Sequence, residues 1–442
     1  MAGLVNLQGS QGSQGSQGSQ GSQGSQGSGA WVPPFATPHV AGPASTLLPG
    51  ADPSVAFSLM TTQQDLVNLT REYTKWNPLR PLFPQQLDLP PTGRSSDVFR
   101  WGADIRVENA VSELMQPIRM SRIGGASGGC FMAAHEGKRW PIFSVTRPTR
   151  EQFEIQTDSV YQHIDLRPER LTEIINQIGI PMQFWASIVD LNPVDHHYTL
   201  ELLFVALQGL SHVNQVAKHT LACPRPAAFS PSIQPIINPR RFGAFPSGHA
   251  AEAFLVARLL QVISGQERVS KSAKKDDYVL ETHLQRLAGR IADNRVVAGV
   301  HFPVDGTAGR LVGECFAEYF LFRCGAPQIK RGVQWQPRSF DASKFYARND
   351  TSYIRTFNPF EQLPSEDNKN PTAYFSAPSA VTSARPSCIG IELDTPTETR
   401  MDSALFDETS ILAALWRRVE AEWKLETAWK GDDKAVGKGG KQ

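Results

Sequence analysis

The 442-residue chain is longer than one compact domain usually is, and its charges nearly cancel. Lys and Arg number 44 against 43 Asp and Glu, which leaves a formal charge of +1. This balance excludes the broad basic field with which proteins bind nucleic acids or anionic membranes. The chain is 40% hydrophobic and has no long apolar run, so we expect a soluble globular protein without membrane spans. Any chemistry on anions must therefore be local.

The five cysteines are odd in number, widely spaced and without a Cys-x-x-Cys pair. They are Cys130, Cys223, Cys315, Cys324 and Cys388. This spacing argues against a disulfide framework and against a zinc site, and it favours a reducing compartment. The first residues lack a basic segment followed by an apolar one, so no secretory signal peptide is predicted. A cytoplasmic location is the default expectation, and export by another route stays open.

The chain begins with segments that have little to bury. Residues 8–28 repeat Gln-Gly-Ser seven times, and a Pro-rich stretch follows from Trp31 to about Pro53. Such a composition cannot offset the conformational entropy lost on folding. Residues 1–54 are therefore predicted to form a disordered arm.

Residues 55–198 are predicted to form an N-terminal helical bundle. Apolar residues recur there at helical spacing, and no run of alternating apolar and polar residues bounded by turn pairs competes. One set on a predicted helix face is Leu171, Ile174, Ile175 and Ile178.

Residues 199–325 are predicted to form a second helical bundle. Apolar stripes and boundary residues predict helices over 199–220, 246–264, 282–298 and 303–322. Proline falls in the first turn of two of these helices, where its missing N–H costs nothing, and Gly299 ends the third. Residues 326–442 are predicted to form a long irregular wrap with one amphipathic helix within 401–425 and a frayed tail. The predicted fold class is all-α.

Three short motifs follow one another in the second bundle. They are Lys218-x6-Arg225-Pro226, Pro246-Ser247-Gly248-His249 and Arg295-x5-His301-x3-Asp305. Each is weak alone, but the ordered set is specific. The Lys and the two Arg supply permanent cations that suit a tetrahedral oxyanion. Ser247 and the Gly248 amide fall in a predicted first helical turn, where the helix dipole favours an anion. The motifs therefore predict a local oxyanion site.

The breaks between the predicted helices can turn these side chains toward one another. Arg225 precedes a proline, which pushes its backbone into an extended conformation that can turn back toward Lys218. His301 and Asp305 are four residues apart across the first turn of a helix. The carboxylate can therefore accept a hydrogen bond from Nδ1 of the histidine and leave Nε2 with its lone pair.

Taken together, the three motifs resemble the signature shared by vanadium-dependent haloperoxidases and the type 2 phosphatidic-acid phosphatase (PAP2) superfamily. The resemblance implies two packed helical bundles with the oxyanion site in the second. It implies that His301 is the ligand of vanadium in a haloperoxidase or the nucleophile in a phosphatase, and that His249 is the general acid/base. It also implies that Lys218 polarises bound peroxide, whereas Asp305 orients His301. The residues that would hold the anion are Lys218, Arg225, Ser247, Gly248, Arg295 and His301. The third motif of the family usually opens with Ser, where this chain has Asn294.

The remainder of the chain favours the haloperoxidase branch. Membrane phosphatases of the superfamily carry spans, and its small soluble acid phosphatases have little sequence before the first motif. This chain has a long helix-rich segment there. The resemblance then implies that a halide is oxidised with hydrogen peroxide at a histidine-ligated vanadate, which gives a hypohalous acid equivalent.

The resemblance also implies cofactors and partners. Vanadate is the expected cofactor, phosphate can occupy the same site, and neither haem nor nucleotide is expected. The expected partners are hydrogen peroxide, a halide and a small organic acceptor, in a homo-oligomer that binds no nucleic acid and no membrane. Phe242 is the halide-site candidate, because this position is Phe in chloroperoxidases and His in bromoperoxidases. Two alternatives stay open: a soluble acid phosphatase that acts through a phosphohistidine, and a non-enzymatic anion-binding scaffold.

Overall fold

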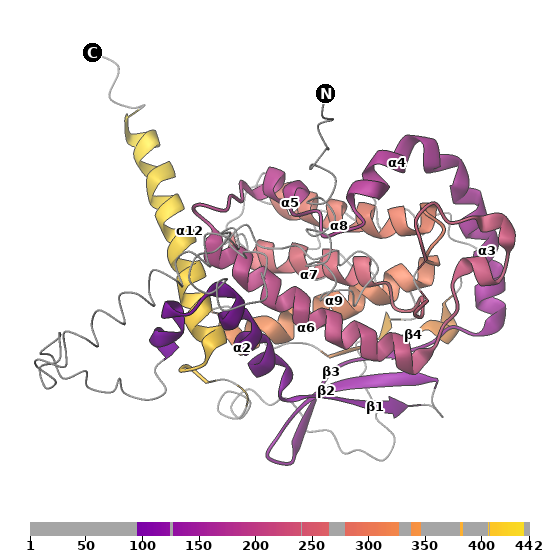
Figure 1. The fold of residues 1–442 in the computed structure, drawn as a ribbon, viewed down its shortest axis with the longest axis horizontal. Helices are drawn as coiled ribbons and strands as arrows, with labels where there is room; N and C mark the ends of the chain where they lie inside the picture. Colours follow the sequence, from indigo (N-terminus) through magenta and orange to yellow (C-terminus); the bar gives the residue numbers. More distant parts are fainter. Residues whose placement is uncertain are drawn as a thin grey trace, which may run out of the picture.

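The computed structural model describes residues 95–123, 127–239, 241–264, 279–326, 337–345, 381–382, 405 and 407–436. The predicted disordered arm, most of the predicted wrap and Cys388 lie outside these ranges. Within them the chain is mostly helical, with one small sheet packed beneath the helices (Figure 1).

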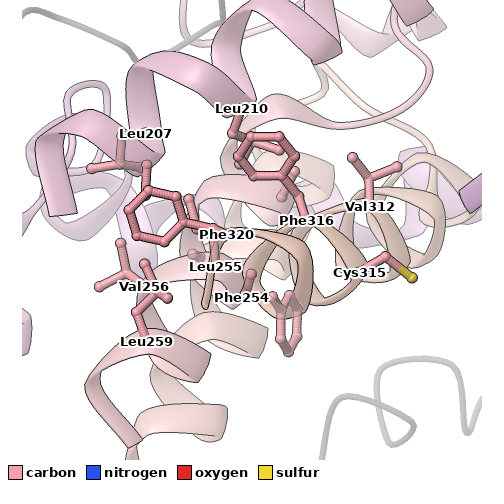
Figure 2. Close-up of a cluster of buried hydrophobic side chains, with 14 of the residues drawn as sticks. Leu207, Leu210, Phe254, Leu255, Val256, Leu259, Val312, Cys315, Phe316 and Phe320 are labelled. Carbon is pink, nitrogen blue, oxygen red and sulfur yellow. The ribbon is translucent and has the colours of Figure 1, made fainter. Parts of the chain in front are cut away.

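The helices predicted in the second bundle are confirmed. They are α6 (His197–Leu221), α7 (Gly248–Ile263), α8 (Val279–Val297) and α9 (Pro303–Cys324). The side chains of α7 and α9 are buried on nearly every face, because other elements surround both helices. Leucine, valine and phenylalanine side chains from α6, α7 and α9 interdigitate in one core (Figure 2). This core sets the positions of the helix ends that carry the three motifs.

Two glycines of α9 let it approach α7 closely. A Cβ atom at Gly313 would collide with the backbone carbonyl of Ala251, and one at Gly309 would lie 2.5 Å from the carbonyl oxygen of Ser247. Both neighbours are backbone atoms that cannot turn aside. The close contact brings the first turns of the two helices together, and the amide of Ser247 donates to the carbonyl of Asp305 at 2.9 Å.

Further helices surround this group. They are η2 (Ser95–Arg100), α2 (Ala103–Met115), α3 (Arg150–Gln162), η4 (His163–Leu166), α4 (Arg167–Asn176), α5 (Met182–Val189) and α12 (Ile411–Val436). Short 3-10 turns occur at η5 (Pro226–Ala228), η6 (Pro231–Ile233) and η9 (Ala342–Lys344). None of the described helices is long and apolar enough to cross a membrane.

The C-terminal helix α12 is longer than predicted and belongs to the folded body. Leu412, Leu415 and Trp416 are buried, as the amphipathic pattern predicted. Glu113 of α2 accepts the Ile411 amide at 2.8 Å, at the first residue of α12. Glu422 of α12 in turn accepts the amides of Tyr198 and Thr199, at 2.7 and 2.9 Å. Carboxylates that accept such amides complete helix N-termini, so each contact fixes one helix against another.

The described chain is mostly helical, as predicted, but it is not all-α, because a five-stranded sheet runs in the order β1-β2-β3-β4-β5. The strands are β1 (Ile118–Ile123), β2 (Gly128–His135), β3 (Lys138–Thr146), β4 (Arg338–Asp341) and β5 (Val381–Thr382). β1, β2 and β3 form an antiparallel meander, β4 is parallel to β3, and β5 is antiparallel to β4. The first three strands lie in the region predicted as the first helical bundle. The last two lie in the predicted irregular wrap.

The sheet could not be predicted from the sequence for two physical reasons. β2 and β3 are buried on both faces over most of their length, so their residues form continuous apolar runs instead of an alternating pattern. The turn between them is Glu136-Gly137, in which both residues have positive φ values of 47° and 82°. Such φ values suit a two-residue hairpin, but Glu-Gly is not one of the usual turn pairs.

Cys130, on β2, is disulfide-bonded, whereas the buried Cys223, Cys315 and Cys324 are free. The spacing of the cysteines argued against a disulfide framework. Spacing along the chain, however, says nothing about which residues a sheet brings close together.

Most of the predicted apolar face of helix α4 is exposed, whereas its polar side is packed against the protein. Of the predicted apolar face only Ile174 is buried, and Leu171, Ile175 and Ile178 are 43, 51 and 42% exposed. The polar side of α4 is packed against α8 instead, where Glu173 pairs with Arg290 at 2.9 Å. An amphipathic pattern shows that a helix has an apolar and a polar face. It does not show which of the two faces packs against the protein when the neighbouring helix is itself polar.

Candidate functional site

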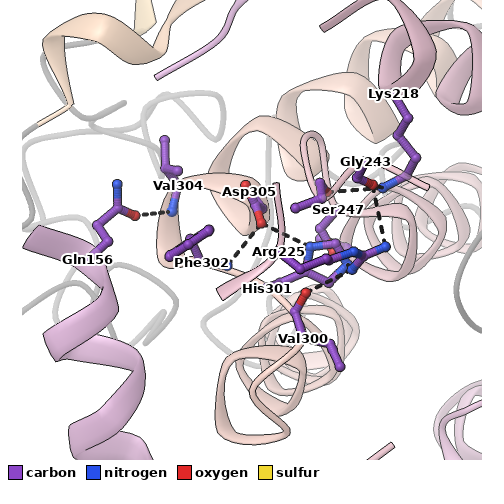
Figure 3. Close-up of polar contacts among 12 residues, drawn as sticks. Gln156, Lys218, Arg225, Gly243, Ser247, Val300, His301, Phe302, Val304 and Asp305 are labelled. Carbon is purple, nitrogen blue, oxygen red and sulfur yellow. Dashed lines mark hydrogen bonds and ion pairs between the residues drawn. The ribbon is translucent and has the colours of Figure 1, made fainter. Parts of the chain in front are cut away.

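The first motif brings two cations to one carbonyl. Lys218 lies near the end of α6 and is buried, and its Nζ donates to the carbonyl oxygens of Gly243 and Ala244 at 3.1 and 3.0 Å. Arg225 has the extended backbone that its following proline predicted, with φ −86° and ψ 158°. Its Nη2 donates to the same Gly243 oxygen at 3.4 Å. The chain therefore turns back so that both cations face the same space (Figure 3).

The second motif forms the N-terminus of α7. Ser247 is the N-cap, one residue before the helix begins, and its Oγ accepts the amide of Ala250 at 3.4 Å. The structure thus places Ser247 just outside the first turn in which it was predicted. Its own amide donates to Asp305, which leaves the amides of Gly248 and His249 as first-turn donors for which the helix supplies no acceptor. These amides and the helix dipole favour an anion at this end of α7.

The third motif fixes the tautomer of His301. Its Nδ1 lies 3.0 Å from Oδ2 of Asp305, which also accepts the Phe302 amide at 2.9 Å. Its Nε2 lies 3.0 Å from Nη1 of Arg225 (Figure 3). A guanidinium can only donate, so Nε2 must accept and the ring proton must sit on Nδ1. His301 is therefore held with its Nε2 lone pair directed toward the cations, as the spacing to Asp305 predicted.

The remaining pair consists of Arg295, in the last turn of α8, and His249, in the first turn of α7. Nη1 of the arginine lies 3.4 Å from Nε2 of the histidine, and both side chains are buried. Nε of Arg295 has no hydrogen-bond partner among the described residues. Buried donors without acceptors are costly, and oxygen atoms of an anion are suitable acceptors for them.

The pKa values record how deeply these charged groups are buried. Burial, followed by the charge of Arg225, lowers the pKa of Lys218 well below its usual range. Burial lowers the pKa of Arg225 to about 10 and that of Arg295 to about 9. Burial also raises the pKa of Asp305 to about 7. An anion bound among Lys218, Arg225 and Arg295 would raise their pKa values again, because its negative charge replaces the stabilisation that water gives to exposed cations.

The two histidines are held neutral. Burial lowers the pKa of His249 well below its usual range, and Arg295 adds to the shift. Burial also lowers the pKa of His301 well below its usual range. The charges of Arg225, Lys218, His249 and Arg295 lower it further. All of the predicted cations therefore lie within electrostatic reach of His301.

The stability of the protein is expected to fall as the pH drops below the usual histidine pKa of about 6.5. In that range the histidines bind protons in the unfolded chain but stay neutral in the folded chain. Each histidine therefore lowers the free energy of unfolding by up to about 1.4 kcal/mol for each pH unit. Asp305 acts in the opposite direction over the same range, because its folded pKa is raised.

A His249→Asn variant isolates the histidine contribution. Urea unfolding at pH 7.5 and 5.5 should show a smaller loss of stability in this variant than in the native chain. The same loss in both would contradict the assignment, and the exposed His212→Asn serves as the control.

Phe242 packs against the two cations of the first motif. Its ring centre lies 5.4 Å from Nζ of Lys218 and 5.2 Å from the guanidinium carbon of Arg225. The three residues line a cavity of about 720 Å³, together with Arg241 and His219.

Sequence reasoning missed two further residues of the site. Gln177, at the end of α4, is fully buried and accepts from Arg295, which is 118 residues away in the chain. Glu252 of α7 is also buried, and its charge raises the pKa values of Lys218 and Arg295. Glu252 lies one helical turn after His249, which is a signal that could have been used. Nothing in the sequence near Gln177 points to its partner.

Residues 199–326 match the PAP2 superfamily. This matched segment holds α6, α7, α8 and α9 and therefore all three motifs. The chain carries a PAP2 superfamily domain. Members of this superfamily are generally phosphatase-like enzymes. No curated protein matches the chain.

Proposed function

We propose that this protein is a vanadium-dependent haloperoxidase, which oxidises a halide with hydrogen peroxide to a hypohalous acid equivalent. The observation that carries the proposal is the state of His301. Its Nε2 lone pair faces Arg225 while Asp305 holds its other nitrogen, and the charges of Lys218 and Arg295 also act on the ring. A ligand of an oxyanion centre needs this arrangement.

The site residues fit vanadate. The three cations offset its charge, the Gly248 amide and the Ser247 hydroxyl can donate to its oxygens, and His301 supplies the nitrogen ligand. The unpartnered Nε of Arg295 fits an oxygen acceptor in the same space. When bound, vanadate supplies the Lewis-acid centre at which peroxide becomes reactive toward a halide.

The protein residues have separate tasks in this reaction. His249 takes a proton from hydrogen peroxide, and its lowered pKa keeps the ring neutral, with one nitrogen free of a proton. Lys218 and Arg225 stabilise the negative charge of the bound oxyanion beside the cavity that they line. Asp305 maintains the tautomer of His301. Phe242 forms the wall that a halide would contact.

The choice between the two enzyme classes rests on elements outside the PAP2 domain. α2 to α5 and strands β1 to β3 precede α6 and pack around the domain, which is the kind of long leading segment that favours the haloperoxidase branch. A phosphatase that acts through a phosphohistidine is the second candidate. The same Nε2 lone pair of His301 would serve it as nucleophile, and the PAP2 match is compatible with it.

The test compares both activities in one preparation. Protein loaded with orthovanadate should brominate an activated dione in the presence of hydrogen peroxide, and protein without vanadate should not. Rapid cleavage of phosphomonoesters by the vanadate-free protein, without any bromination by the loaded protein, would replace the proposal by the phosphatase. Tight phosphate binding without either activity would indicate the scaffold.

A further inference from the structure

Helix α4 lies outside the PAP2 domain, but its polar face reaches the oxyanion site. Two contacts tie α4 to α8, the helix that carries Arg295. Glu173 accepts from Nε and Nη2 of Arg290 at 3.0 and 2.9 Å, and Arg170 donates to Oδ1 of Asn294 at 3.3 Å. The two helices are therefore fixed to one another next to the site.

The C-terminal end of α4 holds the guanidinium of Arg295. Nη2 of the arginine donates to the carbonyl of Ile174 at 3.3 Å and to Oε1 of Gln177 at 3.2 Å, and Nη1 donates to the carbonyl of Gln177 at 3.4 Å. Carbonyls in the last turn of a helix have no partner within the helix and form the negative end of its dipole. They orient the cation with partial negative charges, and the charges of Glu173 and Glu252 also act on Arg295.

The side chain of Gln177 is itself fixed at both ends. Its Nε2 donates to Oε1 of Glu173 at 3.1 Å, and its Oε1 also accepts from Nδ2 of Asn294 at 2.9 Å. The carboxylate can only accept at one end and the guanidinium can only donate at the other, so the amide cannot be reversed. Gln177 therefore presents its oxygen to Arg295.

We propose that Gln177 is a positioning residue that aims Arg295 at the bound oxyanion, and that its neutrality leaves the charge of Arg295 available to that anion. This inference rests on the oxyanion site of the proposed function, but it holds for phosphate and vanadate alike. A carboxylate at this position would also hold the guanidinium, yet it would compete with the anion for the same charge.

Inorganic phosphate, titrated calorimetrically into the purified chain at pH 7, tests the proposal through a double-mutant cycle. Gln177→Met keeps the size of the side chain and removes its three side-chain hydrogen bonds. It should weaken phosphate binding about 10-fold in the native chain and less than about 2-fold in an Arg295→Lys background, because the residue acts through Arg295. The matched control is Gln162→Met, at an exposed glutamine of α3, which should leave the affinity unchanged.

A second variant separates orientation from charge. Gln177→Glu keeps an oxygen acceptor for Arg295 and adds a carboxylate near Glu173, so it should also weaken phosphate binding by about 10-fold or more. Thermal unfolding without phosphate establishes that each variant is folded. A folded Gln177→Glu chain that binds phosphate like the native chain would overturn the role of neutrality.

The remaining outcomes distinguish the inference from the proposed function. Equal losses on Gln177→Met in the native and Arg295→Lys backgrounds would show that Gln177 supports the fold in general, which overturns the inference. Unchanged affinity in Gln177→Met overturns it as well. A native chain that binds neither phosphate nor orthovanadate would overturn the oxyanion site itself, and the inference with it.

Discussion

Replacing His301 with alanine is expected to weaken the binding of orthovanadate by more than about 100-fold and to abolish turnover. Loss of a residue that merely supports a ligand already costs roughly 10- to 100-fold in affinity, so loss of the ligand itself should cost more. The variant also removes one partner each from Asp305 and Arg225, which in the native chain contact the two ring nitrogens of His301. Binding is measured by calorimetry with orthovanadate, and turnover by bromination of the dione.

Two further histidine variants make this result specific. His249→Ala should retain vanadate and lose roughly 100- to 10,000-fold in turnover, because His249 is proposed to move a proton and not to hold the anion. His212→Ala, at an exposed position of α6, should change neither property. Loss of vanadate in both His301→Ala and His249→Ala would contradict the separate roles of the two residues.

Replacing Arg106 with methionine is expected to destabilise the fold by about 3–5 kcal/mol, the usual cost of leaving a buried charge unpaired. Nε and Nη2 of Arg106 donate to the two carboxylate oxygens of Glu201, each at 2.6 Å, and both side chains are buried. Burial raises the pKa of Glu201 even in the presence of this partner. The pair joins α2 to α6. Urea unfolding measures the loss.

The double variant Arg106→Met/Glu201→Met should recover most of this loss, because two apolar side chains of similar size leave no charge buried. The matched control is the exposed pair of Arg150 and Glu154 on α3, which lie 2.8 Å apart. Arg150→Met should cost less than about 1 kcal/mol. A loss in Arg106→Met as small as in this control would contradict the prediction, and so would a double variant less stable than either single variant.

The residues of the candidate site could be found from the sequence because their chemistry is local. Arg225 lies between two prolines, His249 follows Gly248, and His301 lies two residues from Gly299 and from Pro303, so these helix breaks are visible in the chain. The contact between Nδ1 of His301 and Asp305 follows from a spacing of four residues within one helical turn. The helices themselves could be predicted because their apolar stripes extend over several turns.

Other features depended on partners that are distant in the chain. The sheet joins residues near 143 to residues near 338, and no local pattern encodes this parallel pairing. The inward face of α4 is polar only because α8 offers it Arg290 and Asn294. Periodicity alone placed its apolar residues inside.

By itself the sequence determined the positions of the main helices, the three motifs and the local oxyanion chemistry within a chain of nearly zero net charge. Only the tertiary structure decided that a sheet supports the helices, that Lys218 and Arg225 meet at Gly243, and that Gln177 holds Arg295. The physical reason is the range of the interactions. Helix formation and capping act over a few residues, whereas the direction of a buried cation is set by whichever carbonyls the whole fold brings to it.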